Sequence, residues 1–247
     1  MAPSLDEVVP GLATLFPKKL ERLDHDVSKG LRVVQRILSS TESDLQNRRF
    51  LLDSFHEYGM PFMTGEYWQP WEKYMNESGF GAMQIPTEIV DCLRRLMPLK
   101  IKSAIEIGVY RGGLSYFMAA VLQRVSPDFT LTMVDPFDSL LGFEQFSKIL
   151  NLKKTMPSTS SDFSGQAFEL VFIDGDHTYA GAMRDYTNLG KFATKAIAFH
   201  DIHDHSADSG TVPAWDDIKK NVCQTHEVYE IAHTVPRGLG IGLAVRA

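Results

Sequence analysis

The chain has 247 residues and a net charge of −6, and 44% of its residues are hydrophobic and 23% are charged. These proportions are typical of an ordinary globular protein, and the acidic balance without a long Lys/Arg run excludes nucleic acid as a partner held by bulk electrostatics. Cys92 and Cys223 form neither a CxxC motif nor a disulfide framework, which favours a reducing cytoplasm. We expect neither a signal peptide nor a membrane span, because no basic n-region or uninterrupted long apolar stretch is present.

Residues 1–85 lack strand-like runs and favour short helices. Pro17 and Gly30 are expected to break the first part, and the sequence TESD at 41–44 predicts a capping box at a helix start. An aromatic segment at 58–80 follows, which fits a core or subunit contact, or a lid over an apolar or sugar-bearing substrate. We therefore expect residues 1–85 to form a helical and aromatic cap or oligomerisation segment, and the protein to be a homo-oligomer.

From residue 86 the pattern changes to alternating helices and strands. Short apolar runs predict strands, and amphipathic stretches predict helices between them: strands at 103–107, 131–134, 170–173 and 196–199, and helices at 113–124, about 140–152, about 178–192 and about 213–222. A third strand in the long connection is too weak to place. Two closing strands, near 227–234 and 240–246, would add an antiparallel edge. This order predicts an α/β domain over residues 86–247 with a doubly wound, mostly parallel, seven-stranded sheet.

The segment EIGVYRGG at 106–113 joins the strand at 103–107 to the helix that begins at 113. Gly108, Gly112 and Gly113 have no Cβ, so the backbone can turn tightly there and approach a ligand. The start of the helix offers free N–H groups, which suit a carboxylate or phosphate. The glycine spacing differs from G-x-G-x-x-G, which disfavours a dinucleotide dehydrogenase.

An acid ends or follows each of four predicted strands: Glu106, Asp135, Asp174 and Asp201. Because the carboxyl ends of parallel strands share one sheet edge, we expect these carboxylates to form a single polar site. Asp135 lies 27 residues after Gly108, where an acid that binds ribose hydroxyls is expected. The pattern therefore predicts a nucleotide or nucleoside site.

Several motifs carry a resemblance to a known family: EIGVYRGG at 106–113, VDP at 134–136, FIDGDHTY at 172–179 and FHD at 199–201. Together they resemble class I S-adenosylmethionine (SAM)-dependent methyltransferases. The 172–179 motif and the closing GLGIG run resemble the branch that includes macrocin-type sugar O-methyltransferases and cephalosporin-hydroxylase-like proteins. The resemblance covers about residues 84–247 and implies a Rossmann-like fold with SAM as the cofactor.

The resemblance also implies roles for single residues. Glu106 and the Gly108–Gly113 loop would hold the methionine moiety of SAM, with Tyr110 and Ser115 reaching its carboxylate and Asp135 binding the ribose. The segment before the strand at 170–173 also offers Ser161 and Asp162 as candidates for contacts to the adenine ring.

A divalent metal often lies beside the methyl group in this branch. Asp174 and Asp201 match two of the ligand positions, and His200 stands where a carboxylate is expected. The implied site, Asp174, His200 and Asp201, would hold Mg²⁺ or Mn²⁺, and the imidazole shifts its preference toward Mn²⁺, Fe²⁺ or Zn²⁺.

The predicted function is thus a SAM-dependent, metal-assisted O-methyltransferase that acts on a hydroxyl of a small molecule, a natural product or sugar. Asp174 and His177 are the catalytic candidates. His177 would be the general base because imidazole titrates near neutral pH, although a helix cap or a donor to Asp174 is the alternative. Two other functions stay open: a hydroxylase-like or other non-methylating enzyme of the same fold, indicated by His200, and a non-catalytic nucleoside-binding module.

Overall fold

The structure, a computed structural model, describes residues 17–58, 82, 84–204, 209–233 and 239–247. Its centre is a seven-stranded sheet with the strand order β3-β2-β1-β4-β5-β7-β6. The first five strands are parallel, and β7 runs antiparallel to both β5 and β6. This sheet confirms the predicted α/β fold. The strands are β1 (Ser103–Ile107), β2 (Thr130–Val134), β3 (Leu152–Lys154), β4 (Leu170–Ile173), β5 (Ala196–His200), β6 (His226–Ile231) and β7 (Ile241–Arg246).

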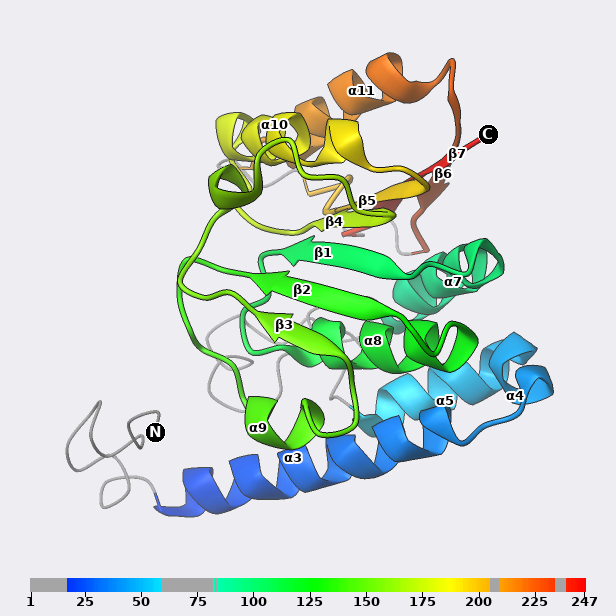
Figure 1. Cartoon of the computed structure of the whole chain (residues 1–247), viewed down its shortest axis with the longest axis vertical. Helices are drawn as coiled ribbons and strands as arrows, with labels where there is room; N and C mark the ends of the chain where they lie inside the picture. The colour runs from blue at the N-terminus through cyan, green and yellow to red at the C-terminus, as the bar shows by residue number, and fades with distance from the viewer. Residues whose placement is uncertain (1–16, 59–81, 83, 205–208, 234–238) are drawn as a thin grey trace.

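Helices cover both faces of the sheet (Figure 1). One face carries α7 (Pro86–Leu96) and α8 (Gly113–Val125), and the other carries α10 (Tyr179–Asn188) and α11 (Thr211–Val222). Successive residues of a strand point to opposite faces. In β1, Ala104 accordingly belongs to the core that includes α7 and α8, and Ile105 belongs to the core that includes α10 and α11. The strands are therefore apolar on both sides, as a doubly wound sheet requires.

In the described part of the chain, three helices precede this domain: α3 (Pro17–Leu38), α4 (Glu42–Gln46) and α5 (Arg48–Tyr58). Figure 1 shows α3 and α5 below α8, on the side away from the sheet. Val34 and Phe55 are fully buried in the same hydrophobic core as Phe117 of α8. The rings of Phe55 and Phe117 meet edge to face, with centroids 4.8 Å apart. These helices thus cover the outer side of α8.

The predicted capping box at residues 41–44 is confirmed. The Thr41 hydroxyl accepts a hydrogen bond from the Asp44 N–H at 3.1 Å, and the Asp44 carboxylate accepts one from the Thr41 N–H at 2.9 Å. Such a box satisfies two backbone donors that the first turn of a helix leaves free. The short helix α4 begins there.

Four predicted elements are wrong in extent. Gly30 does not break the first helix, because α3 continues through it; packing outweighs the roughly 1 kcal/mol that glycine costs inside a helix. The helix expected at 140–152 is reduced to α9 (Phe143–Phe146), and the unplaced third strand, β3, occupies the end of that stretch. The helix expected at 178–192 ends at Asn188 and is followed by a 3₁₀ turn, and β6 ends at Ile231 rather than at 234.

Of the aromatic segment predicted at 58–80, only Tyr58 lies among the described residues. None of the helices in the described ranges combines the length and apolar character needed to cross a bilayer.

Candidate active site

A cavity of about 1200 Å³ lies at the carboxyl ends of the parallel strands. The neighbouring strands β1 and β4 lie at the centre of the sheet, where the strand order reverses and ligands of open α/β sheets usually bind. The acids expected at four strand ends all line this cavity: Glu106, Asp135, Asp174 and Asp201. The predicted convergence of these carboxylates is thus present in the fold.

Gly108 allows two loops of the cavity to touch. Its φ is +86°, and a Cβ at this position would lie 1.9 Å from the carbonyl oxygen of Asp174. On the other side of the loop, Asp135 Oδ2 accepts hydrogen bonds from the N–H groups of Val109 and Tyr110, at 3.0 and 2.9 Å. Asp135 therefore orders the loop after β1 while also lining the cavity.

Three residues predicted at the cofactor lie behind the cavity wall instead of lining it. Gly112 caps the start of α8 with a φ of +85°, and the carbonyl of Gly113 accepts a hydrogen bond from the Tyr58 hydroxyl at 2.8 Å. Ser115 is fully buried beside Glu106. Their positions support the loop and the acid, whereas Tyr110 lines the cavity as expected.

Glu106 is almost fully buried, and burial raises its pKa to about 8. The nearby Ser115 hydroxyl opposes this rise, whereas the negative charges of Asp174 and Asp135 add to it. Its Oε2 atom accepts no hydrogen bond from the residues that the structure describes. A cationic ligand with N–H groups would stabilise the ionised form of this carboxyl group.

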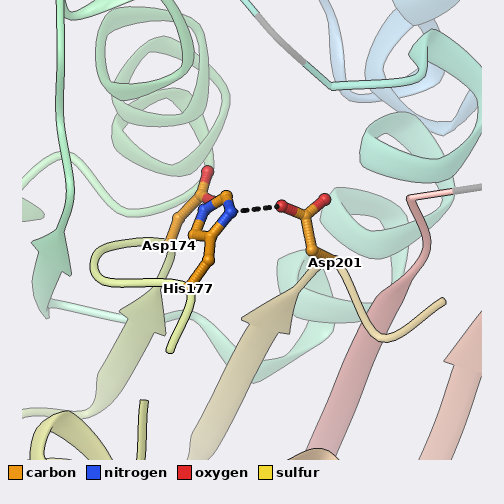
Figure 2. Close-up of side chains that lie close together, drawn as sticks. All are labelled: Asp174, His177 and Asp201. Atoms are coloured by element: carbon orange, nitrogen blue, oxygen red, sulfur yellow. Dashed lines mark ion pairs between the residues drawn. The ribbon is translucent and has the colours of Figure 1, made fainter. Parts of the chain in front are cut away.

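Asp174, His177 and Asp201 bring three potential metal-binding atoms within 4.8 Å of one another. Figure 2 shows the His177 ring close to Asp174, with a dashed ion pair to Asp201. His177 Nδ1 lies 3.4 Å from Asp201 Oδ2, and its Nε2 lies 3.8 Å from Asp174 Oδ1. Two carboxylates and one imidazole fit a divalent first-row cation.

His200, which the sequence predicted as a metal ligand, is not part of this group. Its Nδ1 lies 3.0 Å from Asp174 Oδ1 and 3.1 Å from Asp201 Oδ1, and its side chain is almost fully buried where it lines the cavity. The chain turns sharply after β5, since Asp201 has a φ of +61°. His200 thus holds the carboxylates, and His177 is the imidazole within reach of a shared ion.

The charges of this cluster depend on one another. Burial acts to raise the pKa of Asp174, but the positive charge of His200 and the neighbouring His177 ring outweigh it and lower the pKa. Burial raises the pKa of Asp201. The neighbouring Asp174 carboxylate raises the pKa of His177 to about 9. Burial opposes protonation of His200, but the charges of Asp174 and Asp201 raise its pKa to about 10. The protein alone therefore keeps both rings protonated at neutral pH.

The two residues predicted at the adenine, Ser161 and Asp162, do not line the cavity. Asp162 instead accepts a hydrogen bond from the Thr159 N–H at 2.8 Å and caps a 3₁₀ turn. Ser160, which precedes Ser161, lines the cavity, and its hydroxyl donates a hydrogen bond to Asp185 Oδ1 at 2.6 Å. This turn therefore lines the cavity through Ser160, which is next to the two predicted residues.

Gln84 is a cavity residue that sequence reasoning missed. It is 3% exposed, and its Nε2 donates a hydrogen bond to Asp174 Oδ2 at 2.9 Å. It precedes α7 by two positions and lies on the N-terminal side of the domain boundary predicted after residue 85. No local motif marks it, and its partner is 90 residues away in the chain.

A second cavity, of about 970 Å³, lies among α4, α7 and the end of α8. Its charged side chains include Arg48 and Asp91, which pair with each other at 2.7 Å. The glycine loop and the strand-end acids do not reach it. The chemistry described above therefore belongs to the larger cavity.

Comparison with known proteins agrees with this location. Residues 105–202, which contain the glycine loop and all four acids, match the family model of a methyltransferase domain. No curated protein matches the sequence. Residues 105–202 of this chain are thus similar to a methyltransferase domain, in line with the predicted enzyme class.

Solved structures show the same fold. An O-methyltransferase from Bacillus cereus in complex with SAH (S-adenosylhomocysteine) is similar over 87% of this chain and 96% of its own, with 11% identity and a TM-score of 0.50. A protein assigned as an O-methyltransferase from Klebsiella pneumoniae is similar over 68% of this chain and 84% of its own, with 19% identity and a TM-score of 0.50. A protein assigned as a caffeoyl-CoA O-methyltransferase from Staphylococcus aureus is similar over 81% of this chain and 99% of its own, with 13% identity and a TM-score of 0.52.

Proposed function

We propose that the protein transfers the methyl group of SAM to a hydroxyl oxygen of a small molecule, assisted by a divalent cation, Mg²⁺ or Mn²⁺. One observation carries the proposal: the acids that follow β1, β2, β4 and β5 line a single cavity of about 1200 Å³. SAM has a sulfonium, an ammonium and two ribose hydroxyls, so it brings positive charge and hydrogen-bond donors to a cavity that is rich in acceptors.

The cofactor would lie across the strand ends. Glu106 faces the ammonium end of the methionine moiety, beside the loop that contains Tyr110. Asp135 accepts hydrogen bonds from the ribose hydroxyls with the lone pairs that its loop contacts leave free. At the adenine, Ser160 takes the place that we predicted for Ser161 and Asp162, because it is the residue of that turn that lines the cavity.

The proposed reaction is an in-line displacement. The hydroxyl oxygen forms a bond to the methyl carbon while the carbon–sulfur bond breaks, SAM leaves as SAH, and the hydroxyl proton passes to a base. Because a sulfonium is already a good electrophile, the residues of the chain mainly hold the reactants in line and accept the proton. We propose His177 as the base in its neutral form, which the positive charge of a cation held by Asp174 and Asp201 would favour by lowering the pKa of the ring. The same two carboxylates lie on either side of His177 and would stabilise the imidazolium that forms.

Asp174 and Asp201 would hold the divalent cation, with His177 as a third donor within reach. A bound cation would lower the pKa of the substrate hydroxyl and fix its orientation. A neutral imidazole has one free lone pair, so His177 serves either the proton or the cation. In either case His200 positions both carboxylates through its Nδ1 atom.

The finer predictions belong to the same proposal. The acceptor would be a natural product or sugar, as in the macrocin-type branch, and the protein would act in the cytoplasm, where Cys92 and Cys223 stay free thiols. Residues 1–85 would form the cap of the site and the contact between subunits. Tyr58 and Gln84 support the cap, because they bond to the start of α8 and to Asp174.

The test is to incubate the protein with SAM and a panel of sugars, phenols and other hydroxyl compounds and to measure SAH. We expect SAH to form with some acceptors and to stop forming after EDTA treatment, with recovery on adding Mn²⁺. Asp201→Asn should behave like the EDTA-treated protein because it lacks one ligand carboxylate. A protein that binds neither SAM nor SAH would overturn the proposal, and activity that EDTA leaves unchanged would remove the cation from it.

A further inference from the structure

Gln84 differs from the other polar residues of the cavity in how its two amide atoms are used. Its Nε2 donates to Asp174 Oδ2 at 2.9 Å, whereas its Oε1 is buried and has no hydrogen-bond partner among the described residues. The orientation of the amide follows from its partner, because an ionised carboxylate only accepts hydrogen bonds. The atom that is left over is therefore an acceptor.

An unpartnered buried acceptor indicates a missing donor. Burying a polar atom without a partner is unfavourable, so such atoms in native proteins usually face a ligand or water. Gln84 lines the cavity, and so does Glu106, whose Oε2 also accepts no hydrogen bond from the described part of the chain. Asp174 links these residues, since it bonds to Gln84 and its negative charge acts on Glu106.

The two acceptors, Gln84 Oε1 and Glu106 Oε2, indicate which group of the cofactor lies beside them. A carboxylate or an ether oxygen brings no donor, and a hydroxyl brings one. A primary ammonium brings three donors and a positive charge, so it can bond to a neutral amide oxygen and an acid at the same time. In SAM and SAH the α-ammonium of the amino-acid part is that group.

We propose that Gln84 is a cofactor-binding residue whose Oε1 accepts a hydrogen bond from the α-ammonium of SAM, while its Nε2 holds Asp174 in place. This inference rests on the proposed function, because it takes SAM as the occupant of the cavity. It assigns part of the site to the segment before α7, outside the residues 105–202 that match the methyltransferase domain.

The test uses two ligands that differ in the amino-acid part. SAH carries the ammonium, whereas 5′-methylthioadenosine keeps the adenosine and the thioether but lacks it. We expect Gln84→Leu to weaken the affinity for SAH about tenfold or more and to leave the affinity for 5′-methylthioadenosine within twofold, by calorimetric titration of the full chain. Gln84→Glu should keep most of the SAH affinity, because a glutamic acid side chain retains an acceptor oxygen.

Gln123→Leu is the matched control. This glutamine also makes two hydrogen bonds, to the carbonyl of Ile149 and the N–H of Asn151, but it does not line the cavity. It should change neither affinity. Should Gln84→Leu fail to fold, Gln84→Asn, whose shorter amide cannot span both partners, carries the same comparison.

Equal losses for both ligands, or no loss for either, would overturn the role of Gln84 and leave the proposed function intact. Wild-type protein that binds neither ligand would overturn both.

Discussion

The protonation state of Glu106 indicates which charge its ligand carries. Burial raises its pKa to about 8, so it carries a proton at neutral pH in the free protein. An ammonium beside it would favour the ionised form. We therefore expect SAH binding at pH 7 to release up to one proton, measured as the dependence of the calorimetric heat on the ionisation enthalpy of the buffer. Glu106→Gln has no proton to release at this position, so its proton release should be smaller than that of the wild type. If the variant releases as many protons as the wild type, the ammonium binds elsewhere.

The same residue predicts how stability changes with pH. The folded-state pKa, about 8, lies above the ordinary value of 4.5, so the folded protein binds more protons than the unfolded one between these values. The contribution of Glu106 to stability is therefore intact below pH 4.5 and is lost as pH rises toward 8. Glu106→Gln should gain stability relative to the wild type over this range, about 5 kcal/mol at most. Melting temperatures of both proteins from pH 5 to 9 check the sign.

His177 can act as the base or as a ligand of the cation, but its one free lone pair cannot do both at once. As the base, it can be replaced by alanine with little effect on Mn²⁺ binding, because Asp174 and Asp201 remain. We expect His177→Ala to keep its Mn²⁺ affinity within a few-fold, by electron paramagnetic resonance titration, and to lose about 10²–10⁴-fold in turnover. A large drop in Mn²⁺ affinity would instead make His177 a ligand.

At the scale of elements, the loop after β1 depends on the closeness of the loop after β4. A Cβ on Gly108 would meet the Asp174 carbonyl at 1.9 Å, and the φ of +86° is itself unfavourable for alanine. Gly108→Ala should therefore displace Asp174 and abolish SAH binding. Gly165→Ala is the control, since its φ of +80° is similar but no atom lies within 4 Å of the added Cβ. It should cost only about 1 kcal/mol and leave SAH affinity unchanged, by calorimetry and thermal melting.

The elements that carry the site were predictable from local patterns. Strands β1, β2, β4 and β5 are apolar runs that end at an acid, and their parallel pairing brings those acids to one edge. Strand β3 was not predictable, because it has only three residues and two of them are exposed lysines. The long helix α3 was missed because its packing on α8 is a tertiary effect that outweighs the local effect of Gly30.

The site itself divides in the same way. The four acids follow from strand ends, which are local features. Which imidazole completes the candidate metal-binding group with Asp174 and Asp201 does not, because it depends on the turn at Asp201, where φ is +61°. Gln84 was missed for a related reason: its hydrogen bond to Asp174 joins residues 90 positions apart. Sequence patterns indicate positions along the chain, whereas the direction of a side chain depends on packing.

At the scale of the whole molecule, the boundary predicted after residue 85 separates two parts of one hydrophobic core. Ile37 of α3 and Phe117 of α8 are both fully buried in that core, together with Phe172 of β4. A segment that shares a core with the sheet gains its stability from the same contacts. We therefore expect residues 17–58 to unfold together with the sheet and its helices rather than before them.

Hydrogen exchange tests this expectation at single elements. Ile37→Ala removes buried methyl and methylene groups and should cost about 2–5 kcal/mol. If the core is one cooperative unit, the slowest amides of α5 and of β4 should lose protection by the same free energy, and SAH should restore equal amounts to both. Phe192→Ala is the control, since that ring is 43% exposed and its loss should matter little. If only the amides of α5 lose hydrogen-exchange protection, the N-terminal helices unfold separately and the sheet is stable without them.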